Sequence, residues 1–134
     1  MEEREPLEGI AAADAHLGRR VPLPGALPLA RWVEVVAAGP GAVQVEWNLD
    51  ATRAGTPGRL TLYAGLHAPP ERGLPPAQPH GRFEHRHVAL DEAEVELRPV
   101  HELAWEQDGL YLRLTGQGPW TLEQLVALAD ATRA

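Results

Sequence analysis

Apolar and polar residues alternate along most of the middle of this chain, and this alternation constrains the fold more than any other feature of the sequence. The segment AVQVEWNL (42–49) shows it best, because polar residues separate Val43, Val45 and Trp47. Side chains two positions apart point to the same face of a β-strand. The segment therefore predicts a strand with one buried face and one solvent-facing side, as in many antiparallel sheets.

The same period recurs on both sides of this segment. A hairpin is predicted over 102–116, where Asp108 and Gly109 form a tight turn between two alternating runs. Further strands are predicted at 32–36, 59–66, 82–90 and 92–100. We therefore expect an antiparallel sheet of about six to seven strands.

Helices are predicted at the two ends of the chain. At 5–18, Pro6 suits the first helical turn and Gly18 is a typical end signal. Near the C-terminus, Thr121 and Gln124 form a capping box, in which each side chain bonds to the backbone N–H of the other residue. The predicted class is α+β, with the N- and C-terminal helices packed on one face of the sheet.

Length and composition fit one compact domain. A chain of 134 residues with 44% hydrophobic content can bury roughly two-thirds of its unfolded surface around one core, so we assign residues 1–134 to a single domain. The prolines within 67–81 predict an exposed, partly polyproline loop that interrupts the run of strands.

Missing residue types restrict the chemistry available to the chain. It contains no Cys, Ser or Lys, and all 12 basic residues are Arg. Thiol, serine and lysine nucleophiles are therefore absent, as are disulfides and thiolate metal sites. Most covalent catalysis is excluded, which favours a non-enzymatic protein. Arg-rich surfaces and proline-rich loops would also suit a thermophile.

The formal net charge of −7 opposes binding to nucleic-acid phosphate, and no basic stripe offsets it. We therefore expect no nucleic-acid partner. No apolar run approaches the roughly 20 residues of a membrane span, which predicts no membrane partner. The start MEEREP is acidic, whereas a signal peptide is basic and then apolar. If Met1 is the natural start, the sequence predicts a cytoplasmic protein.

The C-terminal segment LAWEQDGLYLRLTGQGPWTLEQLVALADA resembles the ending of a bacterial domain family of uncharacterised function. That family occurs at the extracytoplasmic ends of some anti-sigma factors and in some secreted lipoproteins. VPLPGALPLARWVEV is similar to the family's proline-marked entry into its first strand, and the resemblance is most specific over 102–131. It implies an antiparallel sheet packed by helices and a sensing or binding role, with no catalytic residues to carry over. The membrane anchor and signal sequence of the family have no counterpart in this sequence.

The segment RFEHRHVAL carries two candidate metal ligands. His85 and His87 lie two apart on a predicted strand, so their side chains share a face, about 6 to 7 Å apart. With Glu92 they form a spacing that resembles part of the first motif of cupins, small β-barrels that bind divalent metals. This resemblance implies that His85, His87 and Glu92 are metal ligands. The downstream cupin motif has no match, since only His101 follows, and a polar edge strand explains the same residues.

Three interpretations of function stay open. The first is a non-enzymatic binding or interaction protein without a cofactor. Its partner would be a protein or a small molecule, and a homodimer would form through an uncovered strand edge or the open face of the sheet. The second is a small cupin-like enzyme that depends on a divalent metal. Glu102 and Glu106 could pair as acid and base, although a solvated strand face accounts for them better. The third is a ligand carrier with a pocket between the sheet and a helix, which predicts co-purified small molecules and one large apolar cavity.

Overall fold

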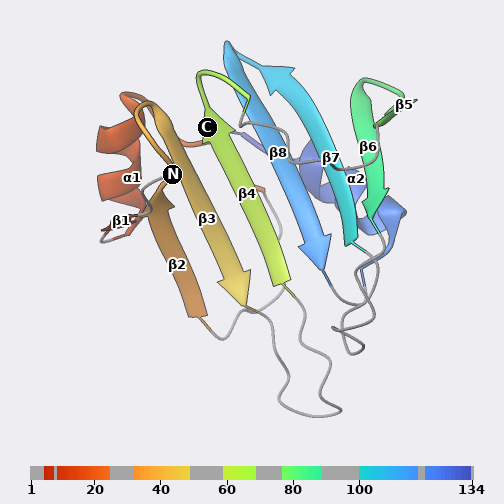
Figure 1. Cartoon of the computed structure of the whole chain (residues 1–134), viewed down its shortest axis with the longest axis horizontal. Helices are drawn as coiled ribbons and strands as arrows, with labels where there is room; N and C mark the ends of the chain where they lie inside the picture. Colours follow the sequence, from red (N-terminus) through yellow and green to blue (C-terminus); the bar gives the residue numbers. More distant parts are fainter. Residues whose placement is uncertain are drawn as a thin grey trace.

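The computed structural model shows one antiparallel sheet with two helices (Figure 1). The structure describes residues 5–7, 9–24, 32–48, 59–68, 77–88, 100–117 and 120–133. The helices are α1 (Ile10–Leu17) and α2 (Leu122–Asp130). The strands are β1 (Glu5–Leu7), β2 (Trp32–Ala37), β3 (Ala42–Asn48), β4 (Arg59–Gly65), β5 (Gln78–His80), β6 (Phe83–Val88), β7 (Val100–Gln107) and β8 (Leu110–Gln117).

The strand order in the sheet is β1-β2-β3-β4-β8-β7-β6-β5. The first four strands follow one another along the chain. The second four run inward from the opposite edge, so the last strand, β8, pairs with β4 at the centre. The predicted α+β class and antiparallel sheet are confirmed, and the three-residue edge strands β1 and β5 were not predicted. Among the described residues no pairing joins β1 to β5, so the sheet is open, unlike the closed barrel of a cupin.

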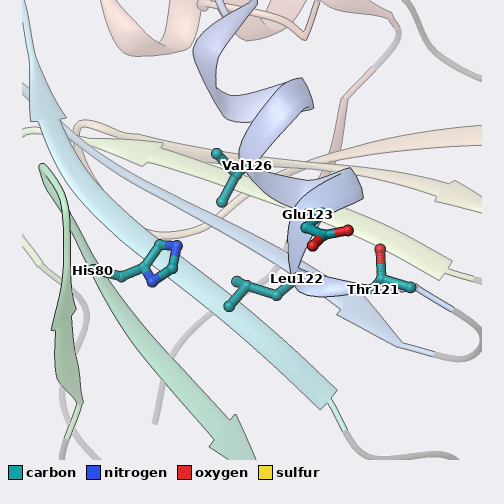
Figure 2. A pocket seen from close by; sticks show the side chains of 5 residues that line it. All are labelled: His80, Thr121, Leu122, Glu123 and Val126. Carbon is teal, nitrogen blue, oxygen red and sulfur yellow. The ribbon is translucent and has the colours of Figure 1, made fainter.

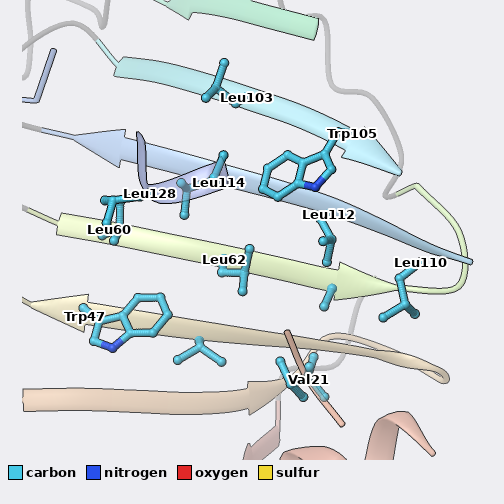
Figure 3. Close-up of a cluster of buried hydrophobic side chains, with 14 of the residues drawn as sticks. Val21, Trp47, Leu60, Leu62, Leu103, Trp105, Leu110, Leu112, Leu114 and Leu128 are labelled. Atoms are coloured by element: carbon cyan, nitrogen blue, oxygen red, sulfur yellow. The ribbon is translucent and has the colours of Figure 1, made fainter. Parts of the chain in front are cut away.

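The predicted alternation agrees with the observed burial on one face of the sheet. The register places Val45, Leu62, Leu114 and Leu103 side by side across β3, β4, β8 and β7, and all four are fully buried. Figure 3 shows the three leucines on their neighbouring strands. The buried residues of both helices belong to the same core cluster, where α1 lies against β2 and β3 and α2 lies against β7 and β8. Both helices therefore cover one face, as the sequence predicts.

The N-terminal helix is shorter than the predicted 5–18. Residues Glu5–Leu7 form the edge strand β1 instead, and α1 begins only after Gly9, which has a φ of 91°. An edge strand accepts Pro6 because its outer side needs no ladder hydrogen bond. The predicted end is confirmed, since Gly18 adopts a left-handed conformation and its N–H donates to the carbonyl of Asp14.

The C-terminal signals are confirmed. Asp108 and Gly109 both have positive φ angles, 54° and 81°, as a two-residue hairpin turn requires. In front of α2, the backbone N–H of Gln124 donates to Thr121 Oγ1 at 3.1 Å, and the N–H of Thr121 donates to Gln124 Oε1 at 3.0 Å. This capping box fixes the position at which the helix starts above the sheet.

Two predicted segments differ from the structure or lie outside it. The proline-rich loop predicted at 67–81 contains β5 near its end, and its residues 69–76 lie outside the described residues. The strand predicted at 92–100 also lies outside them, except for Val100, which begins β7. Leu23 forms a two-bond bridge with Arg133, so the segment after α1 is tied to the end of the chain.

Candidate functional site

The structure places His85 and His87 on β6, on the same face of the sheet as predicted. Cross-strand pairing sets His85 opposite the buried Leu103, and sets His87 opposite His101 of β7. The histidines therefore lie on the face that carries the core and the helices, beyond the edge of the core. The sequence did not show which face of this strand is buried, because neither face is clearly apolar. The sequence also did not predict His101 as a neighbour of His85, because the register of β6 against β7 depends on a connection of more than ten residues.

Four imidazoles gather at this end of the sheet, and we call His80, His85, His87 and His101 the histidine cluster. The closest contact joins His85 Nε2 and His101 Nδ1 at 3.0 Å. The ring of His87 stacks on that of His101, with 4.5 Å between centroids and 6° between planes. The ring of His80, from β5, lies 6.1 Å from that of His85. Three neighbouring strands thus contribute to one surface.

Two of these imidazoles have lowered pKa values. Partial burial lowers the pKa of His85 below its ordinary value, and the charges of His101, His80 and His87 lower it further. The pKa of His101 is lowered by burial and then by His87. In the neutral pair one ring nitrogen donates an N–H and the other accepts through its lone pair.

The lowered pKa values predict that acid destabilises the fold. In the unfolded chain these histidines titrate near 6.5, so below that pH the unfolded state binds more protons than the folded state. The free energy of unfolding should be highest above pH 6.5 and fall as the pH drops through the lowered values. Urea denaturation of metal-free protein between about pH 7 and pH 5 measures this slope.

The carboxylates also contribute to such a slope, so the informative quantity is the difference between variants. His85→Gln with His101→Gln should flatten the dependence relative to the wild type. Equal slopes for the double variant and the wild type would contradict the assignment.

A cleft of about 470 Å³ opens beside the histidine cluster, between β5 and the first turns of α2 (Figure 2). His80 reaches in from the strand side and faces Leu122 and Val126 of the helix. Thr121 and Glu123 line the part nearest the start of the helix. His80 belongs to the histidine-rich segment considered from the sequence, but the sequence did not assign the four helix residues to a pocket, because the cleft arises only where β5, distant in the chain, lies across from α2.

The predicted metal ligands are only partly brought together. The rings of His85 and His87 are nearly parallel, 6.4 Å apart, and Glu92 lies outside the described residues. Within the described part of the chain, no group of three histidine or acidic side chains is placed to hold a metal ion. The ligand set His85, His87 and Glu92 therefore stays a prediction.

The carboxylates considered for acid–base work have different environments. Glu102 is buried on the open face of the sheet, where it accepts a hydrogen bond from Arg86 at 3.0 Å and lies 3.6 Å from Arg113. Glu106 lies four positions further along β7, and its side chain is exposed. The guanidinium groups hold Glu102 in a structural ion-pair network, which favours the structural interpretation over a catalytic pair.

Comparison with protein-family models, with curated proteins and with solved structures gave no match for this chain. The resemblance of residues 102–131 to the sensor-like family therefore stays a prediction. Neither described helix has the length and apolar character needed to cross a bilayer.

Proposed function

We propose that the protein is a non-enzymatic binding protein whose ligand is a small molecule held in the cleft between β5 and α2. The cleft itself carries the proposal, since its volume of about 470 Å³ falls within the range of about 300–1,000 Å³ common for small-molecule sites. The proposal makes the chain a carrier or a sensor rather than a catalyst.

The lining indicates the chemistry of the ligand. Leu122 and Val126 form an apolar wall, while Glu123 supplies an acceptor and His80 supplies a donor and an acceptor. The oxygen of Thr121 already accepts a bond from the backbone of α2, so its hydroxyl proton is available to a ligand. The net charge of −7 attracts cationic molecules and repels anions. An amphipathic molecule with at least one hydrogen-bond donor fits this set.

A binding role also agrees with the residues that the chain lacks. There is no Ser, Cys or Lys to act as a nucleophile, and the buried carboxylate of Glu102 is engaged by two arginines. We extend the proposal to a cytoplasmic relative of the sensor-like family, in which ligand binding against α2 is passed to a partner through the C-terminal helix.

The proposal is tested by blocking the cleft. A fragment library of small amphipathic amines and alcohols is screened against wild-type protein by ligand-observed NMR, and binders are titrated by calorimetry. Val126→Arg places a long charged side chain in the cleft and should weaken binding of those fragments at least tenfold, about 1.4 kcal/mol.

Ala127→Arg is the matched control, because residue 127 is exposed on the same helix and does not line the cleft. This variant should bind like the wild type. The proposal fails if no fragment binds, or if Val126→Arg binds the fragments as tightly as Ala127→Arg.

A further inference from the structure

The contact between His85 and His101 has a geometry that suits a metal ion as well as a proton. The two facing atoms, His85 Nε2 and His101 Nδ1, are both potential ligand nitrogens and lie 3.0 Å apart. Two nitrogens bound to one tetrahedral zinc ion at about 2.0–2.1 Å are about 3.3 Å apart. A separation larger by a few tenths of an ångström, together with a tilt of both rings that turns their lone pairs to one point beside the N···N line, would therefore turn the hydrogen-bonded pair into a pair of ligands.

The hydrogen that the two imidazoles share does not prevent metal binding. In the metal-free pair, one of the facing nitrogens carries a hydrogen that the other accepts. A metal needs a lone pair on both, so the shared proton must leave that position. It can move to the outer nitrogen of the same ring, which leaves His85 protonated at Nδ1 and His101 protonated at Nε2. Both imidazoles then stay neutral, the form in which histidine binds metals.

We propose that His85 Nε2 and His101 Nδ1 together bind one divalent transition-metal ion, of the class of Zn²⁺, Ni²⁺ and Cu²⁺. Imidazole nitrogens favour these ions over Mg²⁺ and Ca²⁺, which prefer oxygen ligands. The net charge of −7 favours cations in general. Because the described residues place no third protein ligand, water fills the remaining coordination positions. This site is separate from the proposed ligand cleft and goes beyond the proposed function.

The other two members of the histidine cluster differ in their expected contributions. His87 stacks face to face on His101, with 6° between the ring planes, so its nitrogens do not converge with the facing pair. His80 has an exposed side chain on the short edge strand β5, 6.1 Å from His85 between ring centroids. The proposed ligands are therefore His85 and His101, whereas the set expected from the sequence was His85, His87 and Glu92.

Calorimetric titration of tag-free protein with ZnCl₂ and NiCl₂ tests the inference. The wild type should bind one equivalent, and His85→Ala and His101→Ala should each weaken binding at least tenfold. His87→Ala is the matched control, since it removes an imidazole from the same strand and should change the affinity less than threefold. Val126→Arg should also bind metal normally, so that failure of the metal site and failure of the cleft can be told apart.

NMR of the histidine side-chain nitrogens gives a second measurement that needs no variant. On addition of Zn²⁺, the resonances of His85 Nε2 and His101 Nδ1 should move together, and the outer nitrogen of the ring that carried the shared hydrogen should gain a proton. The inference is overturned if no stoichiometric binding occurs, if His87→Ala weakens binding as much as His101→Ala, or if the nitrogens of His80 or His87 respond instead.

Discussion

Replacing Leu114 by alanine should lower the free energy of unfolding by about 2–5 kcal/mol, the range for a large-to-small change in a packed core. Leu114 has no exposed surface and lies on β8, the strand that joins the two halves of the sheet. It stands between Leu62 of β4 and Leu103 of β7, both fully buried (Figure 3). The substitution leaves a cavity that neither β4 nor β7 can fill without moving its own neighbours. We therefore expect a loss in the upper half of this range.

Urea denaturation followed by circular dichroism measures this change. Leu66→Ala serves as the control because it makes the same substitution at a residue that is 52% exposed, where an effect within about 0.5 kcal/mol is expected. If the two variants differ by less than about 1 kcal/mol, the centre of the core does not lie at the β4–β8–β7 junction.

Replacing Gly116 by alanine should destabilise the protein by about 1–3 kcal/mol, as overpacking of a close contact does. An added Cβ would lie 2.9 Å from Trp120 Cγ and 3.0 Å from Leu125 Cδ2. The first of these atoms is bonded to the Cβ of Trp120, so it can move only if the whole indole turns about χ1 or the backbone shifts. Either the indole turns or the helix moves away from the sheet.

A double-mutant cycle with Leu125→Ala isolates this contact. Leu125→Ala removes one of the two overlaps, so the double variant should be more stable than the sum of the two single effects predicts. Strict additivity would show that α2 does not rest on Gly116. Movement of α2 should also alter fragment binding, because Leu122 and Val126 line the cleft from this helix.

The alternation of apolar residues was enough to predict the class of fold and most of the core. The alternating positions from Val43 to Leu114 are buried where the structure describes them, because side-chain direction in a strand depends only on local geometry. The prediction was wrong where a local signal had two explanations. Pro6 suits the first turn of a helix and also an edge strand, and the pairing of β1 with β2 decides for the strand.

The candidate site could be predicted only in part. The shared face of His85 and His87 follows from their spacing, but the partner of His85 is His101, which reaches it through the register of β6 against β7. Register depends on the whole sheet and on the length of the connection, neither of which a local pattern contains. The cleft forms because β5 lies near the start of α2 in space, and these two segments are about forty residues apart in the sequence.

The central position of the final strand has a consequence for synthesis on the ribosome. The first four strands are contiguous in the chain, yet β4 obtains its second neighbour only when Leu110–Gln117 has been made. Until then the nascent chain presents an unpaired strand edge with the apolar residues Leu60 and Leu62. Emerging chains are therefore most prone to self-association during this interval, and chaperone capture would matter most at this stage of translation.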